Sequence, residues 1–264
     1  MGDIQAIVLD LDGTLLNSSK VVSSRNLRAV KACHDRGLPV IIATARPPRA
    51  VRKYLQHVPF VDCTVFYNGA LMSCESKQTQ RHISISSDVS ARISEFIRSH
   101  APESYVSYEV NDSWYTSVQV PESQYPHLGI QPTDPKPAVV SNVFIQSLSP
   151  TKILVLGYND WHNIIERFGE YVNLTATDDG ILVQITHKLA SKENGVEWVL
   201  SDMGVDADDV MVFGDDFNDL GLFRRCGFPV AMDNGIPELK RLAKFVTVSN
   251  DEDGVAVALE KFVL

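Results

Sequence analysis

The sequence predicts an α/β protein with a doubly wound, Rossmann-like parallel-sheet core and an inserted α+β domain. Three observations carry this prediction. Continuous apolar runs alternate with helical patterns in the first and last thirds of the chain, as in a parallel sheet buried on both faces. The middle third has instead the turn pairs and strand patterns of antiparallel hairpins. The length of 264 residues allows two domains.

The first third of the chain predicts three buried strands joined by helices. The apolar runs expected to form these strands are 5–10, 39–45 and 64–72. The first helix begins near Ser23 or Ser24, both favourable N-cap residues, and ends at Gly37. The second helix begins at Pro47 and Pro48, because proline is tolerated in the first turn of a helix.

The last third repeats this rhythm. Further apolar strands are expected at 209–216, 228–235 and 245–249. Helices are expected at 192–203, 217–225, 237–243 and 254–264. The same β-α-β-α order at both ends of the chain indicates one sheet that the insert interrupts.

The middle of the chain predicts an α+β insert over 83–186, so that 1–82 and 187–264 form the core domain. A first hairpin turns at Asn111 and Asp112. The other expected elements are a helix at 88–100, a strand at 152–158, a helix at 160–171 and a hairpin at 172–186. Residues 121–137 hold five prolines and are expected to be irregular. The aromatic residues of this part are interpreted as its core, with substrate contact as the alternative: Tyr108, Trp114, Tyr115 and Tyr125.

Composition excludes several classes of partner. A formal net charge of −9 argues against nucleic acid, whose binding depends on Lys and Arg that neutralise phosphates. No run approaches the ~20 apolar residues of a membrane span, and the N-terminus has no basic region followed by a signal-type core. We therefore expect a cytoplasmic protein without membrane or nucleic-acid partners. Reduced, buried thiols are expected at the four scattered cysteines.

Polar residues follow several of the expected strands at their carboxyl ends. These segments are Asp10 to Thr14, Thr44 to Arg46 and Gly214 to Asp219. Ligands of an open parallel sheet bind at this edge, so we expect several carboxylates, a hydroxyl and glycine-rich backbone in one small volume. Such a carboxylate cluster binds hard cations, and Mg²⁺ suits it best together with a substrate phosphate.

Each segment also has a simpler structural explanation when it is taken alone. Asp12 and Gly13 form a common turn pair, and Thr44 is a suitable N-cap for the helix that begins at Pro47. Aspartates after a strand favour a helix N-terminus, and Lys192 fits a solvated helix position. Their joint occurrence at strand ends favours the functional interpretation.

These segments resemble the motifs of the haloacid dehalogenase-like phosphohydrolase superfamily. Its DxDGT motif matches residues 10–14, its second-motif hydroxyl matches Thr44, its lysine matches Lys192 and its GDxxND motif matches 214–219. The resemblance covers essentially the whole chain.

The position of the insert, between the second and third motifs, resembles the Cof-type subfamily. The triplets Thr44-Ala45-Arg46 and Asn68-Gly69-Ala70 support this. Ala45 stands where that family usually has glycine, and Glu193 follows Lys192 where glycine is frequent. The resemblance implies that the insert is a cap that selects the substrate.

The resemblance implies a phosphatase that works through a phosphoaspartate. Asp10 is the implied nucleophile. Asp12 is implied to protonate the leaving alcohol and then to activate water, and a neighbouring carboxylate favours the proton it needs. Thr44, Lys192 and Asn218 are implied to hold the phosphoryl oxygens.

Mg²⁺ is the implied cofactor. Asp10, the backbone carbonyl of Asp12 and Asp215 are the implied ligands, with Asp219 assisting directly or through water. The residues expected to bind substrate or phosphate are Gly13, Thr14, Ala45, Arg46, Asn68, Gly69 and Asn218.

The implied partner is a small phosphorylated metabolite, either a sugar phosphate or a cofactor phosphate. A sugar-phosphate phosphomutase and a phosphometabolite-binding sensor with incidental turnover stay open as alternatives. The sequence leaves the oligomeric state open between monomer and dimer.

Overall fold

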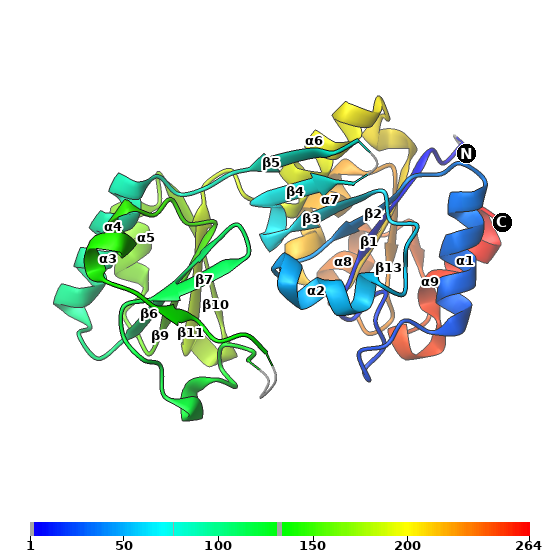
Figure 1. The fold of residues 1–264 in the computed structure, drawn as a ribbon. Helices are drawn as coiled ribbons and strands as arrows, with labels where there is room; N and C mark the ends of the chain where they lie inside the picture. The colour runs from blue at the N-terminus through cyan, green and yellow to red at the C-terminus, as the bar shows by residue number, and fades with distance from the viewer. Residues whose placement is uncertain (1–2, 76, 131–133) are drawn as a thin grey trace. The chain divides into compact units, whose positions relative to one another are not determined.

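The computed structural model describes residues 3–75, 77–130 and 134–264. The chain divides into two compact units (Figure 1). Unit 1 comprises the described residues of Met1–Arg81 together with Ser191–Leu264, and unit 2 comprises those of His82–Ala190. Both ends of the chain thus build unit 1, and its middle builds unit 2. The predicted α/β fold class is confirmed.

Unit 1 is built around an eight-stranded sheet with the order β14-β13-β12-β1-β2-β3-β4-β5. Its strands are β1 (Ala6–Asp10), β2 (Val40–Ala43), β3 (Cys63–Phe66), β4 (Leu71–Cys74), β5 (Thr79–His82), β12 (Val210–Gly214), β13 (Phe228–Ala231) and β14 (Phe245–Val246). The strands from β14 to β3 are parallel. The chain proceeds from β1 to β2 and β3, then returns to the other side of β1 as β12. The boundary between β1 and β12 is therefore the topological switch point, where such sheets bind ligands.

The helices of unit 1 cover both faces of this sheet. They are α1 (Ser24–Asp35), α2 (Pro48–Leu55), α6 (Lys192–Met203), α7 (Leu220–Arg225), α8 (Pro237–Leu242) and α9 (Gly254–Phe262). Right-handed crossovers that run in opposite directions from the switch point place α1 and α2 on one face and α7 and α8 on the other. Helix α1 packs against α9, and α6 packs on β2 to β4 and on α7. Among the described residues, no helix has the length and apolar character to cross a membrane.

One expected strand is wrong in detail. The run 64–72 forms the end of β3, a turn, and the start of β4, which pairs antiparallel with β3. The turn bends at Asn68 and Gly69, whose φ angles are 50° and 91°. The side chain of Asn68 tolerates this left-handed conformation, and Gly69 adopts it without steric cost. The apolar residues on both sides of this turn therefore resemble one continuous buried strand in the sequence.

The expectation of reduced thiols is wrong for Cys63 and Cys74, which form a disulfide. They stand directly opposite in the β3–β4 ladder, with Cα atoms 4.1 Å apart. The β3–β4 hairpin that brings them together is the segment that the sequence predicted to be a single strand. Cys33 and Cys226 are free and buried, and burial raises the pKa of their thiols to about 11 and about 12.

Unit 2 contains a six-stranded sheet with the order β10-β11-β9-β6-β7-β8. Its strands are β6 (Tyr105–Val110), β7 (Ser113–Thr116), β8 (Ala138–Val139), β9 (Lys152–Leu156), β10 (Val172–Thr177) and β11 (Leu182–His187), and its helices are α3 (Ser87–His100), α4 (Asn142–Ser147) and α5 (His162–Phe168). The expected hairpin turn at Asn111 and Asp112 is confirmed, with φ angles of 45° and 77°. The short elements β8 and α4 were not predicted.

The sheet of unit 2 has two different faces, because side chains alternate along each strand. Val183 and Ile185 of β11 point to the face covered by α3, α4 and α5. Leu182 points to the opposite face, where Tyr125 and Ile130 from the loop after β7 cover part of the sheet. Three of the four aromatic residues singled out above are buried in these two clusters, which confirms their core interpretation: Tyr108, Trp114 and Tyr125.

The disulfide predicts the number of reactive thiols. Protein purified without reductant and then unfolded should titrate with two thiols, those of Cys33 and Cys226, and with four after reduction. A thiol-specific chromogenic reagent measures this directly. Four thiols before reduction would contradict the pairing of Cys63 with Cys74.

Candidate active site

The candidate site lies in unit 1, at the carboxyl ends of β1 and β12. Asp10 is the last residue of β1, and Asp215 directly follows β12. The parallel register pairs Leu9 with Phe213, so both carboxylates leave the sheet at the same edge. The sheet therefore brings together two aspartates that lie more than half the chain apart.

A buried lysine joins two of the carboxylates. Lys192 Nζ donates to Asp10 Oδ1 at 2.5 Å and to Asp219 Oδ1 at 2.7 Å. The side chains of Lys192 and Asp219 are fully buried, and that of Asp10 is nearly so. Burial would lower the pKa of Lys192, but the two carboxylates outweigh it and raise that pKa. The ammonium is therefore charged at neutral pH.

Two glycines allow α6 to bring Lys192 to this position. Ser191 caps α6, and its hydroxyl accepts a hydrogen bond from Asn194 N at 3.3 Å. A Cβ on Gly69 would lie 1.9 Å from the carbonyl oxygen of Ser191, and one on Gly195 would lie 2.6 Å from Val65. The turn between β3 and β4 therefore packs directly on the first turn of α6. Gly69 contributes to this packing.

The loop after β12 is held by Asp219. Its Oδ2 accepts hydrogen bonds from the backbone of Asp215 at 3.1 Å and of Asp216 at 3.2 Å, and Asp216 caps the turn in return. Both oxygens of Asp219 are thus engaged, one by Lys192 and one by the loop. Thr14 Oγ1 donates to Asp215 Oδ1 at 2.8 Å, which ties the segment after β1 to this loop.

Gly13 is required where the segment after β1 passes Asp215. Its φ angle is +79°, and a Cβ there would lie 2.1 Å from Asp215 Oδ2. Asn234 donates to the carbonyl oxygen of Gly13 at 2.8 Å and so fixes this turn from outside the expected motifs. No sequence pattern indicated Asn234.

Burial and neighbouring carboxylates raise the pKa values of Asp10 and Asp215. Burial is the largest cause for Asp10, and the charges of Asp219 and Asp215 add to it against the opposing effect of Lys192; the pKa of Asp10 lies well above its usual value. Burial and the charges of Asp219 and Asp216 raise the pKa of Asp215 to about 6, although Thr14 and Lys192 act in the opposite direction. The cluster has more negative charge than one lysine balances.

Asp12 has a different environment, and the expectation that it carries a proton is wrong in this structure. Arg46 donates to its two oxygens from Nε at 2.5 Å and Nη2 at 2.6 Å, and Lys20 Nζ donates to Oδ1 at 2.8 Å. Burial alone would raise the pKa of Asp12, but these hydrogen bonds outweigh it and lower the pKa. Asp12 is therefore an ionised carboxylate between two cations. Lys20 was missed, because a lysine in an exposed turn follows no motif.

The remaining predicted residues form a chain of contacts from β2 to α7. Thr44 is buried; its hydroxyl accepts from Arg46 N at 3.2 Å, and its carbonyl accepts from Asn68 N at 2.9 Å. Asn218 Nδ2 donates to Asn68 Oδ1 at 3.1 Å. Asn218 Oδ1 is buried and accepts no hydrogen bond from the described residues, which marks it as a contact for a donor group of a ligand or a water molecule. Ala45 lies between Thr44 and Arg46 in the chain, and only its backbone groups could bind a ligand.

The site fits a divalent cation. One oxygen each from Asp10, Asp215 and Asp219 lie within 4.8 Å of one another. No described residue donates to the second oxygen of Asp10 or of Asp215, whereas Asp219 is fully engaged. Carboxylate oxygens are the ligands that Mg²⁺ and similar hard cations prefer. The unbalanced negative charge described above is a second reason why a cation fits.

A family model for haloacid dehalogenase-like hydrolases matches residues 7–259. The chain belongs to this family. It is therefore a haloacid dehalogenase-like hydrolase, and its relatives include proteins named as phosphatases, in agreement with the activity expected from the motifs. Members of the family generally use a divalent metal, which agrees with the acidic triad of two buried aspartates and the half-buried Asp215.

The chain is similar over its whole length to named relatives and solved structures. It is 27% identical to a putative phosphatase of Haemophilus influenzae, over 97% of each chain. It is 26% identical to the 5-amino-6-(5-phospho-D-ribitylamino)uracil phosphatase YitU of Bacillus subtilis, over 97% of this chain and 96% of the relative. The structure of TM0651 from Thermotoga maritima has a TM-score of 0.86 at 24% identity, over 98% of each chain, and therefore shows the same fold.

The raised pKa of Asp215 predicts a pH-dependent stability. The folded protein holds a proton on Asp215 that the unfolded chain releases near its usual pKa of ~4, so this stabilising contribution is lost as the pH rises towards about 6. Between about pH 4.5 and pH 7, the Tm of the metal-free wild type should fall relative to that of Asp215→Asn. Adding Mg²⁺ at about pH 7 should raise the Tm of the wild type more than that of the variant. Parallel pH profiles of the two proteins would contradict this assignment.

Proposed function

We propose that this protein is a Mg²⁺-dependent phosphatase that hydrolyses small phosphorylated metabolites through a phosphoaspartate on Asp10. The observation that carries the proposal is the contact of Asp10 with the buried ammonium of Lys192, at the edge of the sheet beside Asp215. One oxygen of Asp10 is held by this contact, and no described residue donates to the other. A carboxylate fixed in this way is suited to attack phosphorus.

In the proposed first step, Asp10 forms a bond to phosphorus while the bond to the ester oxygen breaks. Lys192, the hydroxyl of Thr44 and the amide of Asn218 offer positive charge and hydrogen-bond donors for the phosphoryl oxygens. Such groups contribute most of the catalysis of phosphoryl transfer. One N–H of Asn218 is used by Asn68, and no described residue accepts from the second, which we propose binds the substrate.

Asp12 is proposed to give a proton to the leaving alcohol and then to take one from the water that attacks the phosphoaspartate. The products are inorganic phosphate, the free alcohol and the original Asp10 carboxylate. Asp12 carries no proton while Arg46 and Lys20 hold it. We therefore propose that its contact with Arg46 opens when the substrate binds, and that Arg46 then interacts with the substrate anion. Released from this contact, Asp12 takes up a proton from solvent, which it then gives to the leaving alcohol.

We propose that Asp10, Asp215 and the backbone carbonyl of Asp12 bind Mg²⁺, with Asp219 as a supporting residue. When bound, the ion would reduce the repulsion between the attacking carboxylate and the phosphate dianion. Asp219 is expected to act through the loop, because its oxygens already accept from Lys192 and from the backbone of Asp215 and Asp216.

We propose that unit 2 acts as the cap that selects the substrate. Relatives of the chain include phosphatases named for a ribitylaminouracil phosphate, and a structural neighbour is named as a sugar phosphatase. These names support a small phosphorylated metabolite as the substrate class.

The proposal predicts the loss of activity in Asp10→Asn. Phosphate release from a panel of sugar and cofactor monophosphates should fall by at least ~10³-fold, because an amide is a poor nucleophile for phosphorus. Chelation of divalent cations should abolish the activity of the wild type, and Mg²⁺ should restore it. Colorimetric determination of inorganic phosphate measures each of these outcomes.

Asp35→Asn serves as the matched control, since it makes the same change at an exposed position on α1 and should retain full activity. Appreciable turnover by a folded Asp10→Asn protein would refute the nucleophile assignment. Return of the phosphoryl group to the sugar, without release of inorganic phosphate, would indicate a phosphomutase instead.

A further inference from the structure

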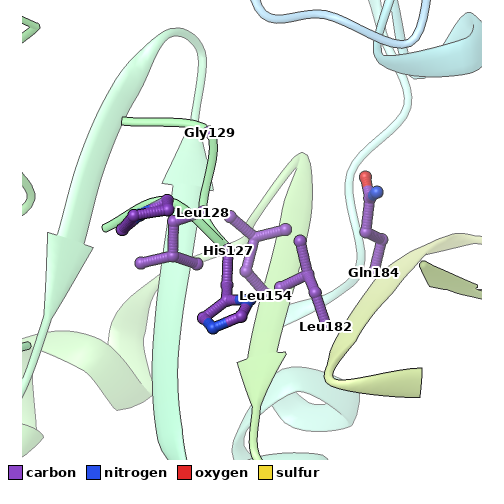
Figure 2. Close-up of a pocket in the computed structure, with 7 residues that line it drawn as sticks. His127, Leu128, Gly129, Leu154, Leu182 and Gln184 are labelled. Atoms are coloured by element: carbon purple, nitrogen blue, oxygen red, sulfur yellow. The ribbon is translucent and has the colours of Figure 1, made fainter. Parts of the chain in front are cut away.

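Unit 2 contains a cavity of about 500 Å³, and its lining includes none of the residues of the candidate site in unit 1 (Figure 2). It lies on the sheet face opposite the helices, between the loop after β7 and strands β9 and β11. The volume falls within the range of ~300–1,000 Å³ that is typical of small-molecule sites. All of its lining residues belong to unit 2.

The walls of this cavity are apolar with two polar side chains. Leu128, Leu154 and Leu182 supply the apolar surface, and His127 and Gln184 supply the polar groups. Figure 2 shows the His127 ring beside Leu154 and Leu182, with the amide of Gln184 beyond them. An imidazole and three leucine side chains offer flat contact to a ring.

The hydrogen-bonding role of Gln184 is set by its neighbour. The half-buried Gln184 accepts a hydrogen bond at Oε1 from Nζ of Lys152, at 3.2 Å. The Lys152 side chain is buried, so its ammonium fixes which way the amide points. No described residue accepts from Nε2 of Gln184, and this NH₂ group is left as a donor for a ligand.

The cavity is formed by well-supported elements. Gln184 and Leu182 alternate on β11, and the ladder pairs Gln184 directly with Leu154 on β9. The loop is closed by backbone hydrogen bonds to the carbonyl of Tyr125, from Leu128 at 3.1 Å and from Ile130 at 3.0 Å. Tyr125 and Ile130 themselves pack into the core on this face. Little ordering is therefore needed when a ligand binds.

We propose that this cavity is a binding site for a planar heteroaromatic ring that carries a hydrogen-bond acceptor on its edge. The chemistry of the lining favours such a ring over a bare sugar. A sugar brings several hydroxyl groups, each of which needs a partner when it leaves water, and two polar side chains do not supply enough. A flat ring with one or two acceptors matches the leucines, the imidazole and the donor of Gln184.

Direct binding to the full-length protein tests the proposal without any need for phosphatase activity. Uridine is compared with ribose, and riboflavin with ribitol, so that each pair offers the same polyol with and without a heteroaromatic ring. Titration calorimetry should give a Kd at least ~10-fold lower for one or both ring-bearing probes than for its partner. If neither ring-bearing probe binds more tightly than its ring-less partner, the proposal is wrong.

Two variants locate the binding in this cavity. Gln184→Glu keeps an acceptor for Lys152 and removes the donor, and Leu128→Ala removes apolar contact from the half-buried loop. Each variant should raise the Kd of the ring-bearing probe at least ~5-fold. Thr175→Glu is the control, because it places the same charge beside Gln184 in the ladder on an exposed residue outside the lining, and it should change the Kd less than ~2-fold.

Equal losses in Thr175→Glu and Gln184→Glu, or unchanged binding in both cavity variants, would overturn the assignment. The ring has two possible sources, the organic part of a phosphate substrate or a separate ligand. Competitive inhibition of flavin mononucleotide hydrolysis by riboflavin indicates the first source, and binding without such inhibition indicates the second. Acetyl phosphate, which has no ring, monitors the phosphatase site independently, so failure of the proposed function is distinguished from failure of this proposal.

Discussion

The buried ion cluster of Lys192 with Asp10 and Asp219 is the interaction on which the site depends. The ammonium holds the carboxylate at the end of β1, and Asp219 holds the loop after β12 through the same ammonium. Removal of one partner from a buried ion pair typically costs about 3–5 kcal/mol, since a charge is then left unpaired away from water. A hydrophobic residue in place of Lys192 would leave two such charges. The close packing of Gly69 and Gly195 is therefore required so that α6 can deliver this one side chain.

The two aspartates of the first motif are separated by their environments. Asp10 and Asp12 are two positions apart, but they contact different cations. Lys192 faces Asp10, whereas Arg46 and Lys20 face Asp12. Asp10 is buried with a raised pKa, and Asp12 is half-buried with a lowered one. The site thus holds one carboxylate with a buried ammonium and the other with a half-buried guanidinium and an exposed ammonium.

Much of the fold followed from local patterns, and the errors arose where contacts over long sequence distances decide. The buried strands, the Ser23 cap and the hairpin at Asn111 are encoded by neighbouring residues and were predicted. The turn at Asn68 and the disulfide it creates depend on pairing between β3 and β4, which an uninterrupted apolar run conceals. The polar residues at the carboxyl ends of the expected strands indicated which side chains come together in the site. The contact of Asp12 with Lys20 was not predictable, because it depends on how an exposed turn folds back.

The central claim is that Asp10 carries the phosphoryl group during turnover. The most direct measurement is acid quenching of the enzyme during hydrolysis of a reactive monoester, followed by proteolysis and mass spectrometry of the peptides. We expect a phosphoryl adduct on the peptide that contains Asp10, located on Asp10 itself and absent when Mg²⁺ is removed. Hydrolysis that proceeds with no adduct at any time, or with an adduct on another residue, would contradict it.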